Sequence, residues 1–188
     1  ATRQLEFVVK KKPDGGFSEW LFGAKVDGTD AEICGPLGRA TFQPAEARNI
    51  LCIAGGSGIA GMMSIFSRGC QEGYFNNHQG NLFFGVRTLK DAFFLDELAG
   101  FASAFPDTLR ITIALSDEVV DAGATPHNGT LDFATGFVHS VASERMSDHY
   151  ENVVAYIAGP PPMVDGAIRS LIVDARLPAE FIRYDKFS

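Results

Sequence analysis

Long apolar runs, cysteine and excess positive charge are all scarce in this 188-residue sequence. No apolar run approaches the roughly 18 residues that a membrane-spanning helix needs. Lys and Arg number 16 against 23 Asp and Glu, which gives a formal net charge of −7. Nucleic acids and anionic membranes attract basic proteins, so this charge argues against both as partners.

The three cysteines do not form a metal-binding pattern. Cys34, Cys52 and Cys70 are evenly spaced along the chain, whereas zinc and iron–sulfur sites use closely spaced pairs or clusters. We therefore predict no metal site on this chain. Reduced cysteines in odd number are typical of cytoplasmic proteins, and we expect this location.

Short apolar runs alternate with helical patterns beyond about residue 46. Such alternation is typical of right-handed crossovers in a doubly wound parallel sheet. We predict an α/β fold with five parallel strands in the order 3-2-1-4-5, whose ligands bind beyond the carboxyl ends of the strands. Strands are predicted at 50–54, 82–86, 109–115, 153–157 and 181–187, helices at 58–72, 91–103, 136–146 and 161–174, and a loose region at 116–135.

The first 45 residues have a different pattern. Residues 4–10 alternate in the manner of a strand, "PDGG" is typical of a turn, and residues 31–34 predict a second short strand. The segment 4–10 has the pattern of one arm of a hairpin whose partner is absent, so we expect this chain to be part of a longer polypeptide. We predict two domains, at 1–45 and 46–188.

A glycine-rich turn follows the first predicted strand of the second domain, in "NILCIAGGSGIAGMM" (49–63). Gly56, Gly58 and Gly61 match the spacing G-x-G-x-x-G. A strand, a glycine turn and a helix start bring bare backbone amides against a phosphate, which predicts a dinucleotide site. The alternative is that the glycines serve only a tight turn and close helix packing.

The second predicted strand does not meet the usual demand of a Rossmann dinucleotide site. That site needs an acidic residue at the end of the second strand, to bind the adenosine ribose. Here the strand ends in "FFGVRT", so Arg87 and Thr88 stand at its tip. The ordinary Rossmann interpretation therefore fails.

A second glycine turn stands at "AGPPPMVDGAI" (158–168). Its prolines suit a first helical turn, where a missing N–H costs no hydrogen bond. In the predicted strand order this turn lies beside the first glycine loop, and the two enclose a slot that suits a flat ring. The alternative is a stiff helix start and nothing more.

Several motifs in the same order give the chain a family resemblance. "GGSGIAGMMSI", "FFGVRTLKDAFFLDEL", "ALSDE", "AGPPPMVDGAI" and "YDKF" together resemble the ferredoxin–NADP reductase superfamily. The chain is most similar to the NADH-dependent reductase components of bacterial multicomponent monooxygenases of the toluene and phenol type. The resemblance runs along the whole chain, so it is more specific than any single motif.

The resemblance implies a flavin-dependent electron-transfer reductase. Residues 1–45 would be the C-terminal part of an antiparallel β-barrel that binds FAD, and 46–188 the NAD-binding domain. Hydride would pass from NADH to FAD, and single electrons then to an iron–sulfur centre that feeds an oxygenase. A [2Fe–2S] centre is expected elsewhere in the full-length protein, and the expected partners are a Rieske-type or other ferredoxin or an oxygenase component.

The resemblance also implies the site residues. The residues beside the reacting rings would be Ala158, Gly159 and Phe187, although a core role is the alternative for Phe187. The flavin pyrophosphate would meet the turn "GGFSEWL", for which an ordinary capped turn is the alternative. The remaining contacts would be Gly15, Gly16, Phe17 and Ser18 for the flavin, Gly55, Gly56, Ser57 and Gly58 for the coenzyme pyrophosphate, and Pro160, Pro161 and Met163 for the nicotinamide.

Three departures from the family pattern stand out. Ala158 replaces a frequent cysteine, and Gly61 stands where proline is usual. The arginine-x-tyrosine-serine/threonine segment that holds the flavin is missing from this sequence. This chain alone is therefore expected to bind FAD poorly or not at all.

Charged residues near the end of the third strand predict the coenzyme preference. Ser116, Asp117 and Glu118 would lie at the adenosine end, where carboxylates accept hydrogen bonds from ribose hydroxyls and repel a 2′-phosphate. Arg87 complicates this prediction because it can bind a phosphate. We favour NADH, and the alternative is that "SDE" only begins a solvated loop.

Other function classes stay open at this point. One alternative is an NAD(P)H reductase with a different acceptor, such as a ferredoxin, a cytochrome or a small quinone. Another is a module that binds NADH without turnover. A P-loop phosphotransferase is a poor third alternative, because no Lys–Ser/Thr pair follows the glycines.

Overall fold

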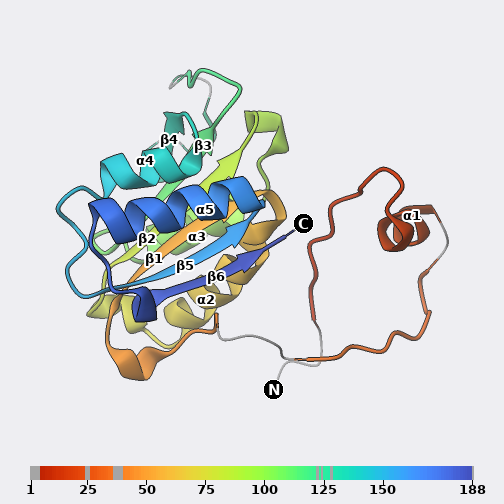
Figure 1. Ribbon diagram of the computed structural model, residues 1–188, viewed down its shortest axis with the longest axis horizontal. Helices are drawn as coiled ribbons and strands as arrows, with labels where there is room; N and C mark the ends of the chain where they lie inside the picture. Colours follow the sequence, from red (N-terminus) through yellow and green to blue (C-terminus); the bar gives the residue numbers. More distant parts are fainter. Residues whose placement is uncertain are drawn as a thin grey trace. The chain divides into compact units, whose positions relative to one another are not determined.

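The computed structural model describes residues 5–23, 26–35, 40–121, 123, 125–127 and 129–187. The chain divides into two compact units, residues 1–39 and 40–188. The larger unit is a parallel sheet with helices on both faces (Figure 1). The assignment of the two units to a flavin domain and an NAD-binding domain stays a prediction.

The sheet has six parallel strands in the order β4-β3-β2-β1-β5-β6. The five predicted strands are present and lie in the predicted order. Their number was wrong, because a sixth strand pairs beyond β3, through Thr112 opposite Asp132 to Leu115 opposite Thr135. The strands are β1 Asn49–Gly55, β2 Gly80–Val86, β3 Leu109–Leu115, β4 Asp132–Thr135, β5 Val153–Gly159 and β6 Ile182–Lys186.

Strand β4 arises in the segment predicted as a loose region. It is four residues long and none of its side chains is fully buried. Such a short edge strand has no apolar run, so local pattern does not distinguish it from a loop.

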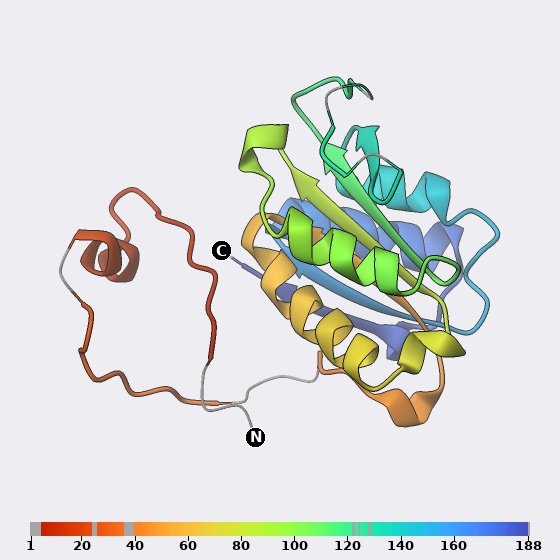
Figure 2. The same cartoon turned by 180° about the vertical axis from the view of Figure 1, so that it is seen from behind.

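Two helices cover each face of the sheet. Figure 2 shows the face covered by α2 Ile59–Gln71 and α3 Leu95–Ala104, and α4 Val138–Arg145 and α5 Pro161–Arg169 cover the other. A single π-helical turn, Ser170–Asp174, extends α5. Short 3-10 helices lie at Pro44–Glu46, Gly56–Gly58, Tyr74–Asn76, Leu89–Asp91 and Ala179–Phe181.

The central strand β1 is buried on both sides. Cys52 and Ala54 pack in the core beneath α2 and α3, whereas Leu51 and Ile53 pack in the core beneath α4 and α5. Burial on both faces explains why this strand reads as one continuous apolar run rather than an alternating one.

The strand order reverses between β1 and β5. From β1 the chain builds β2, β3 and β4 to one side, then returns to place β5 and β6 on the other. β1 and β5 pair in register, with Ala54 opposite Ala158. The two glycine turns that follow these strands therefore start from the same edge of the sheet, at its topological switch point.

The N-terminal unit contains one helix, α1 Gly16–Gly23, in its described residues. The strands predicted at 4–10 and 31–34 are wrong for the part that the structure describes, since residues 5–23 and 26–35 contain no strand. A strand needs a neighbour for its backbone hydrogen bonds, and these residues provide none. Residue 4 and the segment 36–39 lie outside the described residues, and the flavin-barrel assignment stays a prediction.

No helix in the described ranges combines the length and the apolarity needed to cross a bilayer.

The buried strands predict where the fold is sensitive to substitution. Ile113 in β3 is fully buried, whereas Val119 is 80% exposed. We expect Ile113→Ala to lower the free energy of unfolding by about 2–5 kcal/mol, because a cavity replaces packed methyl groups. Urea denaturation checks this, with Val119→Ala as the control expected to change it by less than about 0.5 kcal/mol. Equal losses in the two variants would contradict the burial of β3.

Candidate functional site

The glycine loop after β1 touches the end of β5 directly. Gly58 lies in the short helix Gly56–Gly58, and a Cβ placed on it would overlap the carbonyl oxygen of Ala158. The same Cβ would lie 2.5 Å from the Ala158 carbonyl carbon and 2.9 Å from the amide nitrogen of Gly159. Only glycine permits this approach of one backbone to another.

Gly159 completes the contact from the other side. Its φ of +147° favours glycine, and an added Cβ would lie 3.0 Å from both the nitrogen and the oxygen of Gly55. A Cβ on Gly55 would in turn meet Pro160 Cδ at 3.0 Å and Met163 Cε at 3.1 Å. The structure therefore brings the two predicted turns together as neighbouring walls.

Two helices begin at these turns. After Gly55 the chain passes through Gly56–Gly58 into α2, and after Gly159 it passes through Pro160 into α5. The first amides of a helix lack an intrahelical acceptor and carry a partial positive charge. Both helix starts lie at the carboxyl edge of the sheet. The start of α2 suits an anionic pyrophosphate, whereas α5 begins with prolines, which have no N–H to donate. Ser57, a coenzyme contact predicted from the sequence, lies within the first of these turns.

The three glycines of the G-x-G-x-x-G spacing do not make the same contacts. A Cβ added to Gly61, the third glycine of G-x-G-x-x-G, would meet no atom within 4 Å, whereas one on Gly58 would overlap the Ala158 backbone. The backbone contact is therefore made by the second glycine, and the third occupies open space on α2.

Phe187 follows the last strand and reaches the same turn. Its amide donates a hydrogen bond to the carbonyl oxygen of Gly159 at 2.9 Å. Its side chain is 40% exposed, so it is not the core phenylalanine of the alternative interpretation. Lys186 and Asp165 form an ion pair at 2.6 Å, which ties the end of β6 to α5. An exposed aromatic ring is thus anchored through its backbone beside Ala158 and Gly159.

Arg87 and Asp117 are paired across the ends of β2 and β3. Arg87 Nε lies 2.8 Å from Asp117 Oδ2, and Ser116 Oγ donates to Asp117 Oδ1 at 2.7 Å. These hydrogen bonds, first from Ser116 and then from Arg87, lower the pKa of the Asp117 carboxyl below its usual value. Asp117 therefore stays ionised and offsets the charge of Arg87, a pairing that the sequence did not reveal.

The neighbouring acids bind the backbone. Glu118 Oε2 accepts a hydrogen bond from the amide of Leu89 at 2.7 Å. Asp91 Oδ2 accepts from the amide and the hydroxyl of Thr88, which makes a capping box for the short helix Leu89–Asp91. Both carboxylates thus stabilise the loop after β2, and Asp91 belongs to a 3-10 helix rather than to the long helix predicted there.

The predicted flavin segment forms a self-contained turn within its own unit. Ser18 Oγ accepts a hydrogen bond from the Lys12 amide at 3.0 Å and lies 3.2 Å from the carbonyl oxygens of Lys12 and Gly15. The side chain of Ser18 is buried, whereas Phe17 is 65% exposed and Gly16 has open space beside it. In this structure the Ser18 hydroxyl holds the turn that leads into α1.

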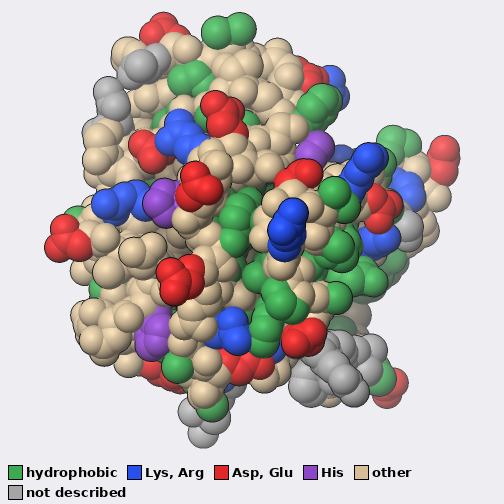
Figure 3. Space-filling model, turned by 60° about the vertical axis from the view of Figure 1, so that its left-hand side comes forward, with side chains coloured by type: hydrophobic (Ala, Val, Ile, Leu, Met, Phe, Trp, Pro, Cys, Tyr) green, Lys and Arg blue, Asp and Glu red, His purple; other side chains and the backbone are tan. Residues whose placement is uncertain are grey.

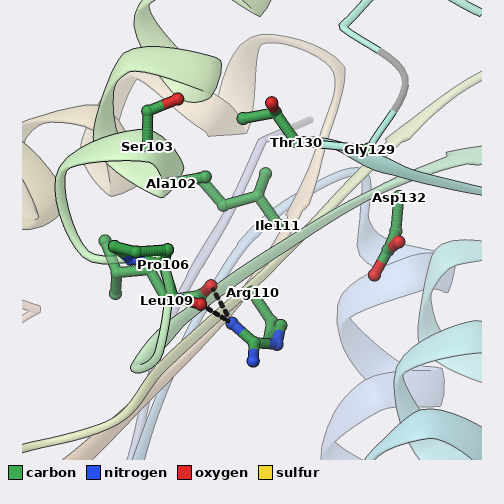
Figure 4. A pocket seen from close by; sticks show the side chains of 9 residues that line it. All are labelled: Ala102, Ser103, Pro106, Leu109, Arg110, Ile111, Gly129, Thr130 and Asp132. Carbon is green, nitrogen blue, oxygen red and sulfur yellow. Dashed lines mark hydrogen bonds between the residues drawn. The ribbon is translucent and has the colours of Figure 1, made fainter.

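A separate cavity lies at the opposite edge of the sheet (Figure 4). It is lined by Leu109 and Arg110, the first residues of β3, and by Asp132, the first residue of β4. Arg110 Nη1 is bonded to the carbonyl oxygens of Pro106 and Leu109, so the guanidinium is committed to the backbone (Figure 4). The candidate site lies beyond Leu115, at the other end of β3, and this cavity is not part of it.

The surface has no extended field of positive charge on the face drawn in Figure 3, where acidic and basic side chains of the described residues are interspersed. Within the described residues, no group of three or more His, Cys, Asp or Glu is arranged to hold a metal ion.

The Gly58 contact leads to a paired test. We expect Gly58→Ala to weaken both the fold and nucleotide binding, because its Cβ overlaps the Ala158 carbonyl. Gly61→Ala adds a Cβ in open space on a helix and is expected to raise the free energy of unfolding by about 0.5–1 kcal/mol. Thermal unfolding and NADH titration measure the two effects. The close approach would be refuted by a Gly58→Ala protein as stable as the wild type.

The comparisons with known proteins agree with this geometry. The family model described as "Oxidoreductase NAD-binding domain" matches residues 52–169. The chain is 31% identical over 182 residues to the ferredoxin–NAD(P)(+) reductase CarAd of Metapseudomonas resinovorans, covering 97% of this chain and 50% of that protein. It is 32% identical over 186 residues to the reductase component of propane 2-monooxygenase of Mycolicibacterium smegmatis, covering 98% and 51%.

Solved structures show the same likeness. The ferredoxin reductase in carbazole 1,9a-dioxygenase superposes with a TM-score of 0.70 at 28% identity, over 95% of this chain and 49% of that one. The Amycolatopsis cytochrome P450 reductase GcoB shares the fold, with a TM-score of 0.73 at 24% identity over 95% and 50%. The chain thus spans about half the length of the relatives it matches. The family model, the paired glycine turns and the parallel sheet together show that the chain belongs to the NAD-binding oxidoreductase domain of the ferredoxin–NADP reductase family.

Proposed function

We propose that this chain binds a reduced nicotinamide dinucleotide across the carboxyl ends of β1 and β5. We further propose that the full-length protein passes its electrons through FAD to a one-electron acceptor of an oxygenase system. The observation that carries the proposal is the backbone contact of Gly58 with Ala158 and Gly159, which joins two glycine turns into one site. The names of two relatives, a ferredoxin–NAD(P)(+) reductase and the reductase component of propane 2-monooxygenase, support the direction of electron flow.

The coenzyme is proposed to extend from the central turns toward β3. Amides of Gly55, Gly56, Ser57 and Gly58 at the start of α2 would hold its pyrophosphate. The adenosine ribose would lie near Ser116, Asp117 and Glu118, which follow β3. Because strands β1, β2 and β3 are consecutive neighbours in the sheet, one extended molecule crossing their carboxyl ends meets both groups.

The nicotinamide end is proposed to lie where α5 begins. Ala158 and Gly159 end β5 there as buried residues, and Pro160, Pro161 and Met163 would form an apolar wall beside the ring. These residues orient the ring and exclude water, and none of them exchanges a proton. The proposed reaction needs no acid–base pair, because the protein's part is to position two rings.

Residues for the flavin are proposed separately in each unit of the chain. Bound FAD would accept two electrons as a hydride and would release them one at a time. In the larger unit, Phe187 presents a partly exposed ring suited to cover an isoalloxazine. In the N-terminal unit, the amides of Gly16 and Phe17 at the start of α1 suit the flavin pyrophosphate. Gly15, whose amide donates to the Lys12 carbonyl oxygen at 3.1 Å, would shape the turn. Ser18 would act indirectly, by holding this turn.

The partner is proposed to be a ferredoxin, of Rieske type or another, or an oxygenase component. A [2Fe–2S] centre outside residues 1–188 is the proposed next carrier, and the cytoplasm the proposed location. Neither nucleic acid nor a membrane is proposed as a partner, in keeping with the net charge of −7.

Flavin reduction tests the proposed function. The full-length protein loaded with FAD is expected to lose its visible flavin absorption when NADH is added without oxygen, because the coenzyme and the flavin meet at one site. Rapid-mixing absorbance measures the rate, and NADH fluorescence titration measures binding separately. Binding without loss of flavin absorption would contradict the proposal and favour a module that senses NADH.

Coenzyme preference tests the charges beyond β3. We expect kcat/KM to be higher with NADH than with NADPH, because ionised Asp117 repels a 2′-phosphate and occupies Arg87. Asp117→Asn releases Arg87 and is expected to shift the kcat/KM ratio toward NADPH by about tenfold.

Asp132→Asn is the matched control, since it removes the same charge from an exposed ion pair with Arg145 on β4 and α4. The assignment fails if the wild type prefers NADPH, or if both variants shift the ratio equally.

A further inference from the structure

A buried polar network holds the segment that precedes β1. Arg183, the second residue of β6, donates a hydrogen bond from Nη1 to the hydroxyl of Tyr156 at 2.7 Å and pairs through Nη2 with Glu46 Oε1. Tyr156 in turn donates to the carbonyl oxygen of Thr41 at 3.1 Å. Tyr156 is fully buried and the Arg183 side chain is only 12% exposed. We call Arg183, Tyr156 and Glu46 the clamp, and residues 41–48 the connecting segment.

Further contacts fix the connecting segment along its length. Phe42 is buried against Tyr74, with ring centroids 5.1 Å apart, and Tyr74 donates its hydroxyl to the carbonyl oxygen of Arg48 at 2.7 Å. Asn152 Nδ2 donates to the Ala47 carbonyl at 3.0 Å. The segment has little regular structure, one 3-10 turn at Pro44–Glu46. Its start and middle are attached to β5 and β6, and its end to the 3-10 helix Tyr74–Asn76 and the residue before β5.

The clamp contributes little net stability to the fold, because burying charged groups costs desolvation free energy. Partial burial of the Arg183–Glu46 pair removes two charges from water, and a well-packed apolar pair is often at least as stable. Glu46 Oε2 is buried without a hydrogen-bond partner in the described structure, which adds to the cost. What a charged, multidentate arginine adds over apolar packing is a fixed geometry for its partners.

The clamp lies directly after the boundary between the two units of the chain, which indicates the function of its fixed geometry. The chain passes from its N-terminal unit to the larger one between residues 39 and 40, and Thr41 and Glu46 follow at once. Strand β6 carries Arg183 near its start, and Phe187 directly follows its end. One strand thus holds both the connecting segment and the aromatic residue beside Gly159.

We propose that Arg183 is a positioning residue for electron transfer, which fixes through Glu46 and Tyr156 the segment that joins the flavin-binding part of the protein to the coenzyme-binding sheet. This inference rests on the proposed function. Ring-to-ring transfer depends steeply on approach, and a displacement of about 1 Å from a distant substitution can cost about a hundredfold in rate. Arg183 belongs to neither proposed cofactor site, so its loss should leave coenzyme binding unchanged.

The test separates rate from binding in the full-length, FAD-loaded protein. For Arg183→Leu we expect the flavin reduction rate at saturating NADH to fall about tenfold or more. The Kd for NADH should stay within about twofold of the wild-type value. Arg183→Lys, which keeps the charge without the fork of donors, should recover part of the rate. Amide hydrogen exchange of residues 41–48 should accelerate in Arg183→Leu.

Arg145→Leu is the matched control. Arg145 on α4 forms an ion pair of 3.5 Å with Asp132 on β4, and both side chains are exposed. Its loss should change neither the reduction rate nor the exchange of the connecting segment. Circular dichroism shows whether each variant folds. If Arg183→Leu does not fold, Glu46→Gln, which keeps the size of the side chain and one acceptor oxygen, provides the same test.

The outcomes are distinct. If NADH does not reduce the flavin of the wild-type protein, both the proposed function and the proposed role of the clamp are wrong. The clamp alone is defeated if NADH reduces the wild-type flavin but the Arg183→Leu and Glu46→Gln variants have the same reduction rate as Arg145→Leu. A parallel loss of rate and NADH affinity also defeats it, since it indicates general damage to the fold.

Discussion

The close approach of Gly58 to the backbone of Ala158 and Gly159 is the constraint on which the site depends. Because no side chain fits between them, the loop after β1 and the turn after β5 are held against each other. This contact sets where α2 and α5 begin, and it directs both helix starts toward the same edge of the sheet. A phosphate-binding turn and a ring-binding slot thus become parts of one proposed surface.

The sheet supports this contact by burying its central strands on both faces. β1 and β5 pair in register as far as Ala54 and Ala158, and the cores above and below the sheet leave them no freedom to shift. A one-residue slip would exchange the side chains of the two cores. Apolar packing therefore fixes the positions of β1 and β5, while the glycines allow the turns that follow these strands to approach each other.

Ion pairs have a different role from apolar packing, because most of them in the described residues lie at the surface and contribute little stability. They hold neighbouring segments of the chain in a fixed orientation. Asp117 holds Arg87 at the ends of β2 and β3, Lys186 ties β6 to α5, and Arg183 holds Glu46 near the start of the larger unit. Each pair fixes a part of the chain whose position matters to the proposed coenzyme and flavin.

Local sequence pattern was sufficient to predict β1, β2, β3 and β5, because strands buried on both faces are continuous apolar runs. It was also sufficient for the two glycine turns, because each lies between such a strand and a helix. The partly exposed β6 was predicted as well, and the ordered motifs were sufficient for the family. The tertiary structure alone decided that β4 completes the sheet, that Gly58 rather than Gly61 makes the contact, and that Arg87 meets Asp117. It also joined Glu46 to Arg183 across 137 positions. The physical reason is that these features depend on which strands become neighbours, and burial and pairing between distant segments arise only when the whole sheet assembles.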